Sequence, residues 1–291
     1  MDCPAKMFDV VCGATSKTLV THPIRRVLAA FAMSMTALTS ALSANTIDVG
    51  HIVQSTDNEI DASTIVVTRL SDGQRWISNP ARAQKRFSPA STSKIPHTLI
   101  ALESGLATPA TVFTWDGVHR SSRNWNRDQT LASAFEHSAV WVYQEIARVA
   151  GPATMSQGLA SFDYGNENVG TADQLTTYWL DDTLKISTIE QIVFLSNLAQ
   201  KRLPLSDETY AAAFYIMESD SGANWSMRSK TGWRFSKTSM DVGWHVGWLA
   251  CSDDTFVFAL NMDMPDTRYL SQRTKITYAV LRAIGAFDCE G

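Results

Sequence analysis

The sequence has 291 residues, with 25 lysines and arginines against 29 aspartates and glutamates, and a formal net charge of −4. No basic run is longer than two residues, which argues against a nucleic-acid partner. The six histidines form no His-x-His or His-x3-His pair and the chain has no Cys-x-x-Cys, so we expect no metal site.

Residues 1–43 are predicted to be an export leader and not part of the fold. A largely apolar stretch at 27–42 follows Arg25 and Arg26 and ends in small residues that suit a signal peptidase. This stretch is shorter than the about 20 apolar residues of a membrane span, and a retained anchor is the alternative. Residues 1–22 are long for the charged region of a signal peptide. We therefore expect a periplasmic protein without a stable membrane span after processing.

Beyond the leader, the apolar pattern changes from strands to helices and back to strands. Short apolar runs bounded by turn residues predict strands at 65–67, 75–77, 227–233, 242–251 and 255–262. Apolar residues at helical spacing predict helices that begin near 91 and lie at 131–150, 188–198 and 271–287. The expected fold class is therefore α/β of the α+β type. It has an antiparallel sheet built from both termini, flanked by helices, and an inserted all-helical domain.

This order of elements predicts how the chain is divided into domains. Residues 44–84 together with 202–291 are expected to form a sheet domain, and residues 85–201 a helical domain. The about 248 residues that follow the leader (291 minus 43) can bury one large core or two that share layers. A cleft between the two domains is the expected place for reactive side chains.

A serine and a lysine three positions apart, Ser91 and Lys94, are the first candidates for reactive residues. On a helix this spacing puts both side chains on one face, so Lys94 can take the proton of Ser91. Pro96 is tolerated only near a helix start, so the helix should begin close to Ser91 and leave its backbone N–H free. A solvated helix start is the plain alternative, but the apolar neighbours Ile95 and Leu99 favour a reactive lysine.

Three later pieces of the sequence add groups that suit the same chemistry. Ser138, in the predicted helical region, offers a second hydroxyl that can shuttle a proton. Lys230, Thr231 and Gly232, on a predicted strand, offer a cation, a hydroxyl and a close backbone approach for an anionic substrate. Arg273 begins the last predicted helix. Each also has a plain structural explanation, as a surface hydroxyl, a strand-edge charge or a snorkelling side chain.

Taken in order, these motifs resemble the penicillin-recognising serine acyl enzymes, for which Ser-x-x-Lys and Lys-Thr-Gly are signatures. The Ser-Asp-Asn motif of class A enzymes is absent, and the chain from about Ala62 to Ala286 resembles the class D (oxacillinase-type) serine β-lactamases instead. The further motifs that carry this resemblance are Ser-Ala-Val at 138–140, Tyr-Gly-Asn at 164–166, Trp-Leu at 179–180, Leu-Lys-Ile-Ser at 184–187, Gly-Trp-His-Val-Gly-Trp at 243–248 and Leu-Asn-Met-Asp-Met at 260–264. Ser93 departs from the pattern, because the family usually has an aromatic residue there.

The resemblance implies hydrolysis of β-lactam antibiotics, penicillins and oxacillin-like compounds, through an acyl-enzyme on Ser91. Lys94 would carry a carbamate (N6-carboxylysine) made from carbon dioxide or bicarbonate, and would act as the general base; no other cofactor is implied. An apolar pocket suits this, because burial lowers the lysine pKa and keeps the amine neutral. Trp179 would donate its indole N–H to the carbamate, with core packing as the alternative role.

The resemblance also implies how the substrate is held. The backbone N–H groups of Ser91 and Trp233 would form the oxyanion hole. Ser138 would relay a proton to the leaving nitrogen, assisted by Lys230. The remaining implied substrate-binding residues are Val140 as a pocket wall, Gly232 beside the oxyanion hole, and Thr231 and Arg273 on the substrate carboxylate. The Tyr-Gly-Asn motif at 164–166 is expected to shape the cleft wall.

Two alternatives share the serine and lysine chemistry. The first is a β-lactam sensor domain that is acylated but not deacylated, and that signals through a membrane segment. The second is a cell-wall transpeptidase or carboxypeptidase, which lacks the deacylating apparatus around Trp179. Homodimers occur in the family, but the sequence shows no interface motif, so a homodimer stays open.

Cys251 and Cys289 are the only cysteines that remain after the leader. The antiparallel pairing of the last strands and the length of the final helix bring the two cysteines to the same end of the sheet. A disulfide needs Cα atoms within about 7 Å, which topology alone does not guarantee. We therefore favour two free thiols over a bridge.

Overall fold

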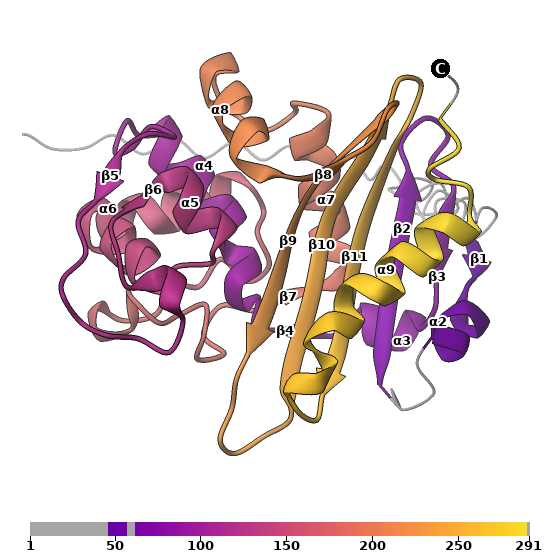
Figure 1. Ribbon diagram of the computed structural model, residues 1–291, viewed down its shortest axis with the longest axis horizontal. Coiled ribbons are helices and arrows are strands. Elements are labelled where there is room, and N and C mark those ends of the chain that lie inside the picture. Colours follow the sequence, from indigo (N-terminus) through magenta and orange to yellow (C-terminus); the bar gives the residue numbers. More distant parts are fainter. Residues whose placement is uncertain (1–45, 57–61, 290–291) are drawn as a thin grey trace, which may run out of the picture. The chain divides into compact units, whose positions relative to one another are not determined.

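The computed structural model describes residues 46–56 and 62–289, and its main feature is a seven-stranded sheet (Figure 1). The strand order is β1-β3-β2-β11-β10-β9-β8; β1 pairs with β3 in parallel, and the other neighbours are antiparallel. The strands are β1 (Thr46–Asp48), β2 (Ser63–Arg69), β3 (Arg75–Ile77), β8 (Glu218–Ser221), β9 (Trp225–Arg234), β10 (Asp241–Cys251) and β11 (Thr255–Met264). The predicted strands, and a sheet built from both ends of the chain, are confirmed. The predicted leader at 1–43 lies outside the described residues.

Most helices follow β3 and precede β8 in the chain. They are α3 (Pro80–Ala83), α4 (Lys94–Glu103), α5 (Leu131–Glu136), α6 (Val140–Ser161), α7 (Thr188–Ala199) and α8 (Asp207–Met217), with the 3-10 helices η1 (Ala90–Ser93), η2 (Arg123–Trp125) and η3 (Ala172–Gln174). Near the two ends of the chain lie α2 (Gly50–Thr56), η4 (Thr267–Ser271) and α9 (Gln272–Ala283). The short pairs β4 (Arg86–Phe87) with β7 (Ile186–Ser187) and β5 (Val112–Phe113) with β6 (Gln129–Thr130) join loops between these helices.

The central strands are buried on both faces, which explains their continuous apolar sequence. In β2, Ile65 and Val67 face one core and Val66 faces the other. In β11, Phe258 and Val257 divide in the same way. The helix α9 packs against β10 and β11 on one face, and α7 packs against β2 and β11 (Figure 1). Helices therefore pack on both faces of the sheet to which β9 belongs.

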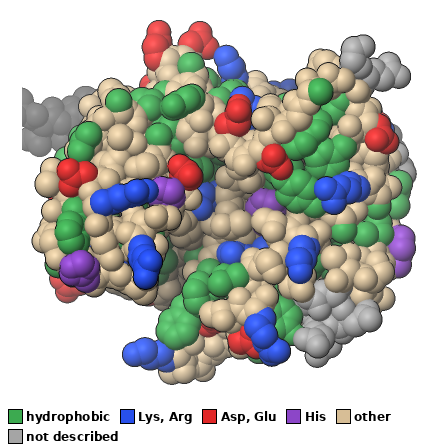
Figure 2. Space-filling model, viewed as in Figure 1, with side chains coloured by type: hydrophobic (Ala, Val, Ile, Leu, Met, Phe, Trp, Pro, Cys, Tyr) green, Lys and Arg blue, Asp and Glu red, His purple; other side chains and the backbone are tan. Residues whose placement is uncertain are grey.

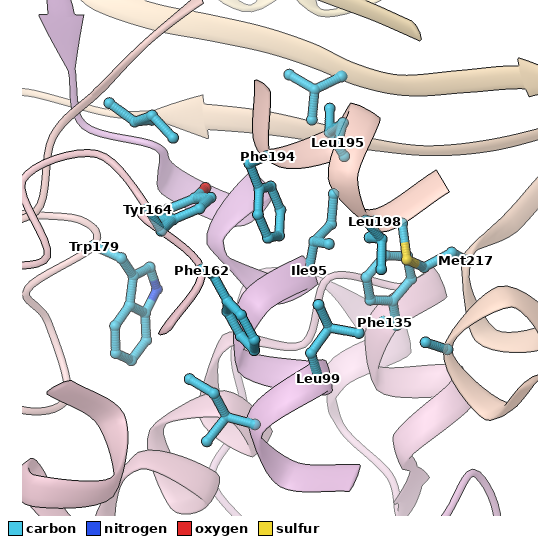
Figure 3. Packing of buried hydrophobic residues seen from close by; sticks show 14 of the residues in the cluster. Ile95, Leu99, Phe135, Phe162, Tyr164, Trp179, Phe194, Leu195, Leu198 and Met217 are labelled. Atoms are coloured by element: carbon cyan, nitrogen blue, oxygen red, sulfur yellow. The ribbon is translucent and has the colours of Figure 1, made fainter. Parts of the chain in front are cut away.

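The helices that follow β3 share one apolar core with the face of the sheet opposite α9. Figure 3 shows Ile95 and Leu99 of α4 beside Phe194 and Leu198 of α7, with Phe162 close to them. Ile95 and Leu99 are fully buried, as expected for residues that lie one turn apart on one face of a helix. This core fixes α4, and with it the residues at its start.

The predicted helix at 131–150 is wrong in one respect, because the structure breaks it into α5 and α6. Ser138 lies in the connecting turn with φ +57°, so it is not within a helix. A second break comes inside α6, where Gly151 has φ +76° and Pro152 follows. Proline disfavours a helical residue before it, and glycine accepts positive φ at little cost. The final helix also ends earlier than predicted, at Ala283.

The expectation of free thiols is wrong, because the structure joins Cys251 and Cys289 in a disulfide. Their Cα atoms lie 5.5 Å apart, within the range that a disulfide needs. Cys251 ends β10, and Cys289 follows α9 on the same end of the sheet. The predicted placement of both cysteines at the same end of the sheet is therefore confirmed, and only the preference for free thiols is wrong.

Across residues 46–56 and 62–289, no helix is long and apolar enough to span a membrane. Within the same ranges, no three side chains from histidine, cysteine, aspartate and glutamate gather where they could hold a metal ion.

Candidate active site

Ser91 and Lys94 lie at the junction of η1 and α4, with Lys94 Nζ 3.0 Å from Ser91 Oγ. Pro96 is the third residue of α4, in the opening turn where a missing N–H costs little. The predicted helix start is thus confirmed. Ser91 is half-buried and Lys94 is completely buried, so the hydroxyl is accessible while the amine behind it is dry.

The burial of Lys94 changes its chemistry. Desolvation holds the pKa of its amine well below the usual lysine value, and the nearby charge of Lys230 lowers this pKa further. The Tyr143 ring lies below the amine, 5.0 Å from Nζ to the ring centroid. A neutral amine at this distance from a hydroxyl can accept its proton, which is what a general base must do.

Buried hydrogen bonds fix the segment just before Ser91. Ser88 Oγ donates to the backbone oxygen of Trp179 at 2.7 Å, and the backbone N–H of Ala90 donates to the same oxygen at 3.0 Å. Trp244 on β10 donates its indole N–H to the backbone oxygen of Ser88 at 2.8 Å. Ala90 has φ +48°, a strained value for a residue other than glycine, which these bonds maintain. The nucleophile is therefore tied both to the sheet and to the loop of Trp179.

Trp179 is completely buried, and its indole N–H has no hydrogen-bond partner among the residues that the structure describes. An unpaired buried donor is costly, so such donors are rare in folded proteins. The resemblance to class D β-lactamases implies an anionic acceptor for this N–H, a carbamate on Lys94. An unpaired indole donor and a buried amine with a lowered pKa are both compatible with that group.

The Tyr-Gly-Asn motif at 164–166 is a structural element of the same region. Tyr164 is buried, and its hydroxyl accepts a hydrogen bond from Gln191 at 3.2 Å. Asn166 Nδ2 donates to the backbone oxygen of Thr183 at 2.9 Å, and Asn166 Oδ1 accepts from the backbone N–H of Lys185 at 2.8 Å. These bonds hold the loop that runs from Trp179 into β7.

Lys230, Thr231 and Gly232 lie on β9, opposite η1. Lys230 is buried, and desolvation together with the charge of Arg273 lowers the pKa of its amine to about 7. A Cβ added at Gly232 would lie 3.0 Å from the backbone oxygen of Pro89, so glycine permits the close approach of β9 to η1. The next residue, Trp233, therefore lies on β9 close to the segment that carries Ser91.

Arg273 lies at the start of α9, as predicted, and its side chain contacts β9. Its Nη1 donates to the backbone oxygen of Gly232 at 2.6 Å, and its Nε donates to Leu270 at 2.8 Å. Desolvation lowers the pKa of the guanidinium to about 10, so the group is charged at neutral pH. The structure therefore brings Arg273 and the Lys-Thr-Gly strand together.

Ser138 lies in the turn between α5 and α6, and Val140 is the first residue of α6. Phe135, which ends the buried face of α5, lies with its ring centroid 5.6 Å from Lys230 Nζ and so sets this turn against β9. No described residue is hydrogen-bonded to the hydroxyl of Ser138, and the structure does not join it directly to Lys94 or Lys230.

A cleft opens beside Lys230 and Thr231, and Figure 2 shows a hollow where lysine or arginine and histidine side chains gather. The sheet, α5, α8 and α9 all contribute to its walls. The lining residues are Phe135, Glu136, Ile216, Met217, Glu218, Ser219, Ser229, Lys230, Thr231, His245, Thr274 and Tyr278.

Sequence reasoning missed two buried histidines near these residues. His97 lies one turn after Lys94 on α4, and burial lowers its pKa to about 3. His245 on β10 lies 3.2 Å from Ser229 Oγ, and burial lowers its pKa to about 3 as well. For His97, the sequence signal was its position three residues after Lys94, which puts the two side chains on one face of the helix.

Comparison with known proteins finds relatives among the penicillin-binding proteins and the β-lactamases. Residues 42–284 match the family described as penicillin binding protein transpeptidase domain. The chain is 39% identical to beta-lactamase OXA-48 of Klebsiella pneumoniae over 75% of this chain and 82% of that protein. It is 40% identical to beta-lactamase OXA-2 of Salmonella typhimurium, over 77% of this chain and 80% of that protein.

Solved structures of class D β-lactamases are also similar to this chain. The class D beta-lactamase YbXI from Nostoc superposes with a TM-score of 0.77 at 33% identity, over 80% of this chain and 98% of that one. FUS-1 (OXA-85), a class D beta-lactamase from Fusobacterium nucleatum subsp. polymorphum, gives 0.78 at 31% identity, over 82% and 98%.

Proposed function

The chain belongs to the class D serine β-lactamases, and on that premise we propose that it hydrolyses penicillins and related β-lactams through an acyl-enzyme on Ser91. The observation that carries this proposal is the 3.0 Å separation of Ser91 Oγ from the buried Lys94 amine, whose pKa burial lowers. Lys94 takes the serine proton as the oxygen attacks the β-lactam carbonyl, and the C–N bond of the ring then breaks.

Lys94 is proposed to work as a carbamate, formed when its neutral amine captures carbon dioxide. Burial supports this, because it disfavours the ammonium form that cannot react. The unpaired indole N–H of Trp179 supports it too, since a carbamate oxygen would accept that hydrogen bond. The charged base then activates water for hydrolysis of the acyl-enzyme, so one group serves both steps.

The other proposed roles come from the family resemblance. The backbone N–H groups of Ser91 and Trp233 are proposed to form the oxyanion hole, on opposite sides of the η1 and β9 contact. Thr231 and Arg273 are proposed to hold the substrate carboxylate, for which a guanidinium offers two donors. The leaving nitrogen is proposed to receive its proton through Ser138, assisted by Lys230, and Val140 is proposed to form a pocket wall.

The setting of the enzyme is a proposal as well. Residues 1–43 are proposed to direct export to the periplasm and to be cleaved, and a homodimer is consistent with the family. The division into a sheet domain (44–84 with 202–291) and a helical domain (85–201) is proposed too, and it is supported by the cleft beside Lys230, whose walls contain residues from both parts, Phe135 of α5 and Lys230 of β9 among them.

Steady-state hydrolysis of a penicillin panel, in degassed buffer and in buffer with bicarbonate, tests this function. We expect many turnovers per enzyme, with higher activity after bicarbonate is added. A β-lactam sensor or a transpeptidase would instead be acylated once and release product very slowly. The Ser91→Ala variant is the control, because it keeps the fold but lacks the nucleophile.

A further inference from the structure

The indole of Trp179 is oriented by neighbouring rings. Its backbone oxygen is fixed by Ser88 and Ala90, but its Nε1 has no hydrogen-bond partner among the described residues. Two aromatic neighbours contact the indole edge to face: Tyr178 with centroids 4.9 Å apart and His97 with centroids 4.8 Å apart, both at 88°. The direction of the indole N–H therefore depends on these two rings.

His97 and Tyr178 are themselves locked together. The hydroxyl of Tyr178 lies 2.7 Å from His97 Nε2, and the two ring centroids are 5.5 Å apart. We assign the phenol as the donor, because a phenol is the stronger acid and an imidazole nitrogen is the stronger acceptor. This places the proton of neutral His97 on Nδ1. All three rings are buried, so the bond is shielded from water.

We propose that His97 is a positioning residue, which holds the Trp179 indole in the orientation that deacylation requires. His97 lies on α4, one turn after Lys94. The same helix therefore positions both the proposed base, Lys94, and the ring that orients Trp179. The inference rests on the proposed function, in which Trp179 keeps the carbamate on Lys94 charged.

Two further observations support this role over simple packing. His97 Nδ1 is buried without a partner among the described residues, and an apolar ring would fill the same space without that cost. The ring also stays uncharged at neutral pH, since burial lowers its pKa to about 3. A neutral ring can pack against the indole without carrying a charge into the dry site.

The test compares acylation and deacylation in single-turnover experiments with oxacillin, followed by mass spectrometry of the intact protein. The variants are His97→Ala, which removes the ring, and Tyr178→Phe, which removes only the hydroxyl that holds His97. We expect deacylation to slow about tenfold while acylation changes less than about twofold, because small displacements of a catalytic group have effects of at least this size. The bicarbonate concentration for half-maximal activity should rise in both variants.

Tyr210→Phe is the matched control, because it also removes a buried tyrosine hydroxyl, one that donates to the backbone oxygen of Leu203 at 2.8 Å. It should leave both rates unchanged. Equal slowing of acylation and deacylation, or wild-type deacylation in Tyr178→Phe, would overturn the inference, even if His97→Ala does not fold. A wild-type protein that never clears its adduct would overturn the proposed function instead, so the two failures are distinguishable.

Discussion

The disulfide between Cys251 and Cys289 should contribute strongly to stability. It closes a loop with a sequence separation of 38 residues. In the chain-entropy relation, a loop of this length removes about 13 cal/mol/K of unfolded-state entropy, or about 4 kcal/mol at 25 °C. For a chain of this size, that loss should lower the melting temperature by about 8–16 °C. The variant to test is Cys251→Ser with Cys289→Ser, in the processed chain that lacks the leader cysteines.

The assay is urea unfolding followed by circular dichroism, with and without dithiothreitol. Reductant should destabilise the wild type by about the amount that the double substitution does, and should leave the double variant unchanged. Activity at 25 °C should be retained, because Cys251 pairs with Trp225 on β9, roughly 20 Å along the strand from Thr231. Two reactive thiols per unfolded, unreduced chain, with an unchanged unfolding midpoint, would refute the reasoning.

Three further predictions concern the reactive residues. Lys94→Ala should abolish hydrolysis. Wild-type activity should fall at acid pH, because protonation of the Lys94 amine blocks carbamate formation, and it should recover when bicarbonate is added. Activity that does not depend on bicarbonate at any pH would instead indicate that the plain amine is the base. Trp179→Ala should acylate but keep penicillin bound to Ser91, as a persistent adduct in mass spectra; clearance at the wild-type rate would return Trp179 to core packing. Gly232→Ala should lower the acylation rate by about 10²-fold or more, because its Cβ would press on Pro89 and move the oxyanion hole, whereas an unchanged rate would show that the strand can shift.

The sequence was sufficient where the governing interactions are local. The spacing of Ser91 and Lys94 and the position of Pro96 are helix geometry, and the structure confirms the helix start. The apolar runs of β10 and β11 predicted buried strands for the same reason, since both faces of those strands need apolar side chains.

The remaining features depend on contacts between distant segments. Ser138 adopts a positive φ in a turn between two helices, and periodicity alone continues a helix through that point. Whether Cys251 and Cys289 come within bonding distance depends on how α9 packs, which topology leaves undetermined at the ångström scale. The role of His97 depends on its contact with Trp179, from a loop about 80 residues later, which no local pattern records.

The most direct test of the proposed mechanism is time-resolved mass spectrometry of the intact enzyme mixed with a penicillin. We predict a transient adduct of one penicillin, located on Ser91 by peptide mapping, which forms and clears while many equivalents of hydrolysed penicillin accumulate. An adduct that persists after one equivalent, or hydrolysis that continues in Ser91→Ala, would contradict the mechanism.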